Sequence, residues 1–297
     1  MNYHVALLGQ PGASKTTVGL SFPGLEHHIF GSSEELTAIN FSKRKDILPI
    51  IKPDWMDYFL KDEKTDERAK FFDDNTSEQE MDVIKRACTA RMIKRYRRYI
   101  LQLKEDLKAG KREELKTVFL DNGTPFLDYF RDWMDFYYVQ KFVTEKGNYD
   151  SIKASIEFSQ QASDFLELFN SLECNTVMSF HVTMTVDEEN AAKVNFMEDS
   201  KKGIRYPKEF NPLVTGNLKY KLAGKFDFAF FLQTEENPGQ PNKYIAKLEA
   251  DASNIGIAKG RLQPFEIGRR IELPNDTFYD FLNAAIAKKY GPDKASN

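Results

Sequence analysis

A nine-residue segment near the N-terminus constrains the fold more than any other feature of the sequence. Residues 3–8 predict a short buried strand, and residues 15–22 predict a helix that ends at Pro23-Gly24. The loop between them follows the P-loop pattern G-x-x-x-x-G-K-[ST], and it comprises Gly9, Gln10, Pro11, Gly12, Ala13, Ser14, Lys15, Thr16 and Thr17. Backbone N–H groups of such a loop turn inward around phosphate oxygens. We therefore expect a nucleotide-binding loop in an α/β fold.

Two side chains of this loop carry the expected chemistry. Lys15 is placed to reach the β- and γ-phosphates of ATP, and Thr16 is placed to ligate Mg²⁺. Ser14 departs from the pattern, because a glycine usually stands there. A serine costs little free energy at this position if its φ angle is negative. We expect a weakened motif that still binds nucleotide.

Short apolar strands alternate with helical stretches along the rest of the chain, which predicts a mostly parallel central sheet flanked by helices. The chain has 297 residues, 41% of them hydrophobic, which is enough for a sizeable core. We expect one domain over 1–297, with a helical insertion at about 40–115 and a β-hairpin extension at about 183–225. Strands are expected near 28–30, 117–120, 176–180, 226–232 and 244–250, with a hairpin of 183–187 and 193–197. Helices are expected over about 78–109, 124–143, 151–172 and 276–289.

Several classes of protein are disfavoured by composition. No apolar run approaches the ~18 residues of a membrane-spanning helix, and the first residues lack the pattern of a signal peptide. The two cysteines, Cys88 and Cys174, are too few for a disulfide scaffold and suit a reducing compartment. We expect a cytoplasmic protein without a membrane partner.

Two polar residues follow apolar strands that we expect beside the P-loop. Asp121 follows 117–120 and fits the Walker B role, an acid near Mg²⁺ at the carboxyl edge of the sheet. The alternative is a turn-forming aspartate before Asn122-Gly123. His181 follows 176–180, where a polar side chain can sense the γ-phosphate, although a histidine at a strand end needs no such role.

Charge is segregated along the chain although the formal net charge is only −3. Residues 54–81 hold ten acids against four bases, and residues 84–112 hold eleven bases against two acids. The basic stretch is either a local site for a polyanion or a solvated helix whose bases pair with the preceding acids.

A second basic stretch lies between residues 201 and 225 and is interleaved with aromatic residues. Bases for phosphates and aromatic rings for stacking suit single-stranded DNA. The alternative is an ordinary lysine-rich surface hairpin. The residues concerned are Lys201, Lys202, Arg205, Tyr206, Lys208, Phe210, Lys219, Tyr220, Lys221 and Lys225.

An ordered set of segments resembles a known family, the phage nucleotide-binding proteins of the RecA-like P-loop class. The set begins with the P-loop and Ser21-Phe22-Pro23 and continues through 118–122, 177–181, 212–216 and 225–232 to Lys259-Gly260-Arg261. Some members are single-strand annealing ATPases of phage recombination. The resemblance implies a RecA-like P-loop NTPase core that binds ATP and Mg²⁺, forms homo-oligomers and handles single-stranded DNA, with a single-strand binding protein as a further partner.

The resemblance also implies roles for four residues. RecA-like ATPases place the water-activating glutamate after the strand that follows the first helix, which here selects Glu34 or Glu35. Both glutamates can instead be first-turn acids of a helix capped by Ser32 or Ser33. In related assemblies a Lys-x-Arg pair from one subunit reaches the γ-phosphate in the next, which here selects Lys259 and Arg261; a solvated basic loop is the alternative.

Two other functions remain open at this point. The arginine-rich stretch 86–98 would suit the phosphate-clamping lid of a P-loop kinase that acts on a nucleotide or a small metabolite. The departure at Ser14 would suit a nucleotide-gated interaction module with little turnover.

Overall fold

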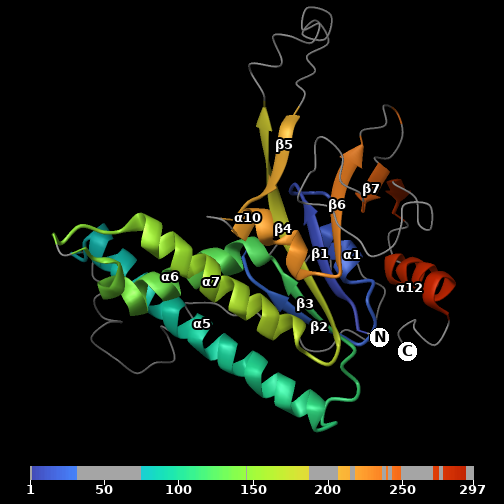
Figure 1. The fold of residues 1–297 in the computed structure, drawn as a ribbon, viewed down its shortest axis with the longest axis horizontal. Coiled ribbons are helices and arrows are strands. Elements are labelled where there is room, and N and C mark those ends of the chain that lie inside the picture. The colour runs from blue at the N-terminus through green and yellow to red at the C-terminus, as the bar shows by residue number, and fades with distance from the viewer. Residues whose placement is uncertain are drawn as a thin grey trace, which may run out of the picture.

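The computed structural model describes residues 2–31, 75–144, 146–186, 207–214, 218–235, 239, 243–248, 270–273 and 277–291. These residues form a central sheet with helices on both faces (Figure 1). The strands are β1 (His4–Gly9), β2 (Leu25–Ile29), β3 (Thr117–Asp121), β4 (Asn175–Val186), β5 (Pro207–Pro212), β6 (Phe228–Glu235), β7 (Lys243–Lys247) and β8 (Arg270–Glu272). The α-helices are α1 (Lys15–Gly19), α5 (Glu78–Lys108), α6 (Gly123–Tyr138), α7 (Ser151–Asn170), α10 (Leu218–Lys221) and α12 (Phe278–Tyr290), and the 3₁₀ helices are η1 (Val139–Phe142) and η2 (Ala223–Lys225).

The sheet is mixed but mostly parallel. Its strand order is β2-β3-β4-β1-β6-β7-β8, and β5 pairs with β4 outside this path. The strands from β2 to β6 in this order run parallel, whereas β7, β8 and β5 pair antiparallel with their neighbours. The expected α/β class with a mostly parallel sheet is therefore confirmed.

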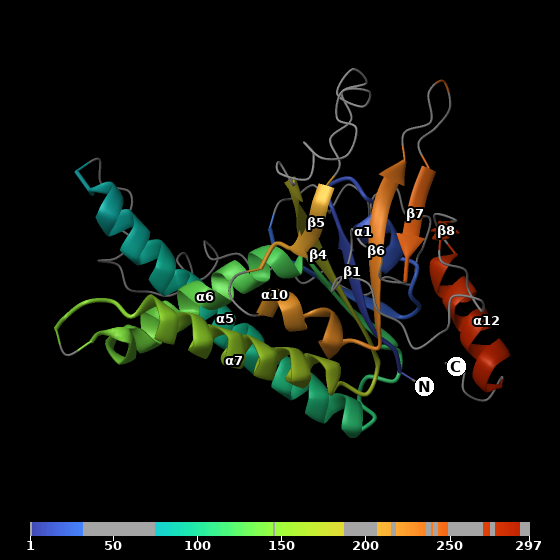
Figure 2. The same cartoon turned by 45° about the horizontal axis from the view of Figure 1, so that its top comes forward.

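Alternate residues of β1 supply two hydrophobic cores, one on each face of the sheet. Ala6 and Leu8 belong to the core that includes α5, α6 and α7, and Val5 and Leu7 belong to the core that includes α12. All four side chains are fully buried. Successive side chains of a strand point to opposite faces, so a strand covered by helices on both faces is apolar throughout (Figure 2).

A buried polar network fixes α5 to β2. Glu26 accepts hydrogen bonds from Tyr99 and from Arg112, the latter at 2.7 Å. His28 lies between Glu26 (2.7 Å from Nε2) and the Tyr96 hydroxyl (2.6 Å from Nδ1). Burial raises the pKa of Glu26, but the opposing effects of His28, Tyr99 and Arg112 are larger together and lower the pKa to about 2. Burial lowers the pKa of His28, so at neutral pH Arg112 supplies the positive charge that balances Glu26.

Helix α1 is shorter than the helix expected over 15–22. Leu20 caps it, and the following N–H groups form the tighter bonds of a 3₁₀ turn, from Ser21 to the Val18 carbonyl (3.1 Å) and from Phe22 to the Gly19 carbonyl (3.3 Å). The chain then reaches Pro23, which cannot continue a helix. The start of α1 at Lys15 agrees with the expectation, and its end does not.

Strand β4 is longer than expected. It passes through His181 instead of ending there, and its second half pairs with β5 in the register Thr183 to Asn211. β-branched residues continue through this half of β4, which favours an extended chain. The predicted hairpin would have paired 183–187 with 193–197, a segment that lies outside the described residues. The observed partner of β4 is a strand more than twenty residues away. Strands β5 and β8 were not expected at all.

Candidate functional site

The carboxyl ends of β1 and β3 and the middle of β4 meet at one edge of the sheet. In the register of the parallel pair β1–β4, Gly9 lies opposite His181. Strand β3 ends in Asp121, and β4 lies between β3 and β1. Three of the residues singled out in the sequence therefore lie close together, because parallel strands end at a common edge.

Two glycines of the P-loop are required by its geometry. A Cβ at Gly9 would lie 2.7 Å from the backbone oxygen of Leu232 on β6. Gly12 has a φ angle of 79° with no atom near its Cβ position, so there only the backbone conformation demands glycine. The loop is closed by a hydrogen bond from the Ala13 N–H to the Gln10 carbonyl at 3.2 Å.

Ser14 adopts a backbone conformation that costs free energy for any residue with a Cβ. Its φ angle is 59°, in the left-handed region, and it is the one non-glycine residue of the described chain with a positive φ. The condition under which serine would cost little, a negative φ, is therefore not met. The backbone at Ser14 follows the path that a glycine would take there. In this conformation the Cβ of Ser14 costs about 1–2 kcal/mol of folding free energy. The side chain forms no capping hydrogen bond that would offset this cost.

The ammonium group of Lys15 folds back over the loop. Its Nζ donates hydrogen bonds to the carbonyl oxygens of Gly9 (3.0 Å) and Gln10 (2.8 Å), and the side chain is only 6% exposed. A cation buried among carbonyl dipoles is a ready partner for an anion. Helix α1 spans only five residues, so its dipole is small, and Lys15 carries most of the positive charge at the loop.

Asp121 connects three elements of the site. Its carboxylate accepts a hydrogen bond from the Thr16 hydroxyl at 2.6 Å and another from the Ser179 hydroxyl. It is 2% exposed. Hydroxyl and carboxylate oxygens are the ligands that Mg²⁺ prefers, so Thr16 and Asp121 suit this ion.

The carboxylate of Asp121 is ionised at neutral pH. Burial raises its pKa, but His27 lowers it, as do the hydrogen bonds from Ser179 and Thr16, and the net direction is downward. The His27 Nε2 lies 3.5 Å from the Asp121 carboxylate, too far for a good hydrogen bond but close enough for an electrostatic interaction. The His27 ring stacks on Phe119 with 4.8 Å between centroids.

His181 lies beside the loop as an uncharged side chain. Burial and the positive charge of Lys15 lower its pKa to about 4, against the opposing effect of Asp121. Its backbone N–H donates to the Thr124 hydroxyl at 2.9 Å, while its Nδ1 is buried without a hydrogen-bond partner. A buried ring nitrogen of this kind is available for a further polar group at the site.

A small hollow of about 230 Å³ opens beside the P-loop. The Thr234 hydroxyl at its wall reaches the Gly12 carbonyl at 3.3 Å. The hollow lies between the loop and the carboxyl end of β6, and it is lined by Gln10, Pro11, Ala13 and residues 231–235.

Sequence reasoning missed two side chains that touch Asp121. Ser179 stands two residues before His181, and the period of two in a strand places both on one face of β4. That spacing could have identified Ser179. His27 could not be found in this way, because the strand was expected at 28–30, whereas β2 begins at Leu25.

Several predicted residues lie outside the described part of the chain. They are Glu34, Glu35, Lys201, Lys202, Arg205, Tyr206, Lys259 and Arg261. Of the basic stretch 201–225, Lys225 forms an ion pair with Glu167 at 2.6 Å, and Lys219 and Lys221 belong to α10.

No protein-family model matches the sequence, and a search of curated proteins finds no significant match. The likeness to RecA-like phage proteins therefore stays an expectation drawn from the residues. No helix within the described ranges combines the length and apolar character needed to cross a bilayer. Among the described residues, no group of three or more His, Cys, Asp or Glu side chains could hold a metal ion.

Proposed function

We propose that the chain is a RecA-like P-loop protein that binds ATP with Mg²⁺, hydrolyses ATP and acts on single-stranded DNA. The observation that carries the proposal is the 2.6 Å hydrogen bond between Thr16 and Asp121, residues 105 positions apart. It joins the hydroxyl expected to ligate Mg²⁺ to the acid expected to hold the same ion. A turn-forming aspartate would have no reason to be buried against the P-loop.

Each side chain at the edge has a distinct part in this proposal. Bound Mg²⁺ would neutralise charge on the β- and γ-phosphate oxygens. Thr16 and Asp121 would hold the ion, and Ser179 orients the Asp121 carboxylate. Lys15 would exchange its carbonyl acceptors for phosphate oxygens, and neutral His181 would hydrogen-bond the terminal phosphate without adding charge.

The remaining parts of the proposal come from the resemblance. Glu34 or Glu35 would activate the attacking water, and Lys259 with Arg261 would complete the site of a neighbouring subunit in a homo-oligomer. The basic and aromatic stretch 201–225 would contact single-stranded DNA, with a single-strand binding protein as a further partner.

The first experiment measures binding of a fluorescent ATP analogue with Mg²⁺ to variants of matched charge. Lys15→Ala is expected to abolish binding, because it removes the cation of the loop. Lys153→Ala removes an exposed lysine from α7 and is expected to keep the parental affinity. Parental ATP affinity in a folded Lys15→Ala protein would refute the nucleotide site.

The second experiment measures phosphate release with and without single-stranded DNA. Stimulation by DNA is expected for an ATPase that acts on single strands. Transfer of phosphate to an added nucleotide or metabolite acceptor, in place of release, would select a kinase instead.

A further inference from the structure

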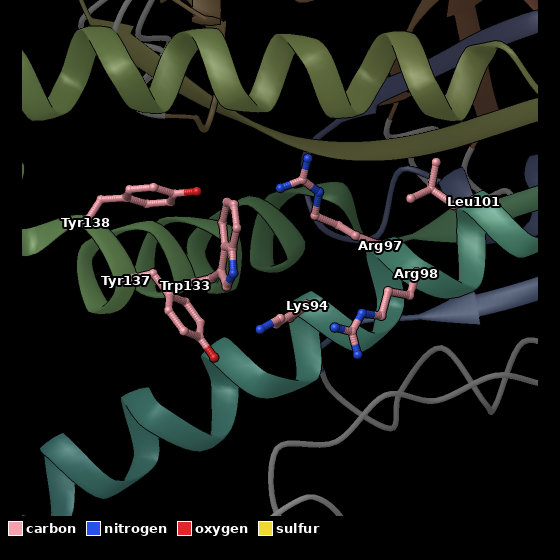
Figure 3. Close-up of a pocket in the computed structure, with 7 residues that line it drawn as sticks. All are labelled: Lys94, Arg97, Arg98, Leu101, Trp133, Tyr137 and Tyr138. Atoms are coloured by element: carbon pink, nitrogen blue, oxygen red, sulfur yellow. The ribbon is translucent and has the colours of Figure 1, made fainter.

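A second pocket lies away from the P-loop, between α5 and α6. Its volume is about 380 Å³, within the usual range for a small-molecule site. Figure 3 shows basic side chains from α5 and aromatic side chains from α6 around it. The lining residues are Lys94, Arg97, Arg98, Leu101, Trp133, Tyr137 and Tyr138.

The basic residues share one face of α5. Lys94, Arg97, Arg98 and Leu101 stand at i, i+3, i+4 and i+7, the spacing that aligns side chains along a helix. In the described part of the chain, none of these three cations forms a salt bridge. Arg86, two turns earlier, is by contrast paired with an acid of its own helix. The basic stretch therefore keeps unpaired charge at the pocket.

The charge that does act on these cations is limited. Burial lowers the pKa of the Arg97 guanidinium, while Tyr138 on α6 and Asp164 on α7 oppose this effect. On α6, Asp135 is engaged by Arg131 and by the Tyr149 hydroxyl. Among the residues that the structure describes, no acid pairs with Lys94 or Arg98, the exposed cations of the pocket, which leaves them open to solvent or to an anion.

Aromatic rings supply the rest of the pocket. The Arg97 guanidinium lies 4.8 Å from the ring centroid of Trp133, and the Lys94 ammonium lies 5.2 Å from that of Tyr137. Tyr137 is 43% exposed and Leu101 is 50% exposed, so an apolar surface remains open beside the charges. Cation–π contacts orient the cations without cancelling their charge.

We propose that this pocket binds single-stranded DNA, with a base against Tyr137 and Leu101 and the neighbouring phosphates at Lys94 and Arg98. The proposal rests on the proposed function in its choice of partner, and it adds a contact on α5 and α6 to the one proposed for the stretch 201–225. Cations interleaved with rings are the recognition mode of proteins that hold single strands without reading their sequence.

Other occupants fit the lining less well. A free mononucleotide is usually held by several buried polar groups that fix its base edge and sugar. The described lining offers instead exposed cations along one helix face and the faces of rings. A peptide made of Asp and Glu alone would use the cations but would offer no ring to the exposed surface of Tyr137 and Leu101.

The test measures binding of a labelled oligothymidylate by fluorescence anisotropy over a series of salt concentrations, without ATP. Replacing Lys94 and Arg98 together by Ala is expected to flatten the log–log salt slope by roughly 1.4. Replacing Arg86 and Lys108 together by Ala removes the same charge from α5 outside the pocket and should leave the slope unchanged. Equal slopes for the two double variants would overturn the proposal.

A second variant tests stacking separately from charge. Tyr137→Ala is expected to weaken binding roughly 5- to 150-fold, and Tyr137→Phe is expected to restore it. In a Trp55→Phe background, the fluorescence of Trp133 should be quenched by the oligonucleotide. Unchanged affinity in Tyr137→Ala would overturn the proposal, as would equal competition by thymidine monophosphate or by polyglutamate.

The two proposals fail in different ways. Lys15→Ala protein should still bind the oligonucleotide through this pocket, because the P-loop lies elsewhere. Parental protein that binds ATP but no single strand would overturn the pocket proposal and the DNA part of the proposed function, and would leave the nucleotide site standing. Protein that binds the strand but no ATP would overturn the nucleotide site alone.

Discussion

Replacing Ser14 by glycine should stabilise the protein, although it removes atoms. The φ angle of 59° at Ser14 costs a residue with a Cβ about 1–2 kcal/mol, and glycine avoids this cost. Glycine also increases the conformational entropy of the unfolded chain, which lowers the stability by about 0.4–1 kcal/mol and offsets part of the gain. Because Ser14 forms no capping hydrogen bond, the net gain is about 0.5–1 kcal/mol.

Urea unfolding measures this gain as a higher midpoint at an unchanged m-value. The expected rise in Tm is roughly 1–3 °C. Affinity for ATP with Mg²⁺ should be unchanged, because the backbone N–H groups of the loop keep their directions.

The neighbouring residue provides a control of opposite sign. Ala13 is 2% exposed and has no positive φ, so glycine there gains no backbone relief. Ala13→Gly removes a buried methyl group, worth about 0.8 kcal/mol, and also raises the conformational entropy of the unfolded chain, so both changes lower the stability. It should therefore lower stability by about 1–2 kcal/mol. If Ser14→Gly destabilises the protein as much as Ala13→Gly does, the argument from left-handed strain is wrong.

Four further predictions follow from the site and the buried network. Asp121→Asn should abolish the Mg²⁺ dependence of ATP binding while binding in EDTA persists, as compared by paired titrations; an intact Mg²⁺ dependence would contradict the assigned role. Of Glu34→Gln and Glu35→Gln, one should slow ATP turnover by at least ~10²-fold, and if neither does, the base lies elsewhere. The pKa of Glu26 is about 2 in the folded protein and 4.5 ordinarily, so its stabilisation is present above pH 4.5 and lost as pH falls toward 2; Glu26→Gln should cost on the order of 2 kcal/mol at pH 7 and less at pH 3, by urea unfolding. The pKa of His181 is about 4 against an ordinary 6.5, so stability should fall from pH 6.5 toward pH 4 as the unfolded chain takes up the proton, and His181→Gln should reduce that fall in the urea midpoint.

The sequence predicted those parts of the site that depend on local patterns. The loop 9–17 and the strand that ends in Asp121 each have a signal within a few residues, a glycine motif and an apolar run before a polar turn. Helix α5 begins at a capping box of Ser77 and Glu80, which the prediction of a helix from residue 78 did not use. Side chains that approach from other strands carry no such signal. His27 reaches Asp121 because β2 pairs with β3, and that pairing joins segments almost one hundred residues apart.

Strand pairing also explains the two missed strands. The partner of β4 is β5, which begins with Pro207 and lies in a stretch that reads as polar and irregular. Its place at the edge of the fold permits proline, because an edge strand leaves one set of N–H groups unpaired. Local propensity disfavoured this strand, and the second half of β4 gave it a partner.

Strand β2 connects the proposed nucleotide site with the helix that carries the second pocket. His27 faces Asp121, and the next residue, His28, faces Tyr96 on α5, since neighbouring side chains of a strand point to opposite sheet faces. A link of this kind transmits binding energy only if it has two arrangements that both ligands shift. Here Glu26, His28 and Tyr96 are all hydrogen-bonded in one arrangement, which fixes α5 against β2. We therefore expect DNA affinity at the pocket of an isolated subunit to be the same with and without ATP and Mg²⁺. Any stimulation of ATP hydrolysis by single-stranded DNA would then arise from assembly of subunits on the strand, and it should increase steeply with protein concentration at a fixed ratio of DNA to protein.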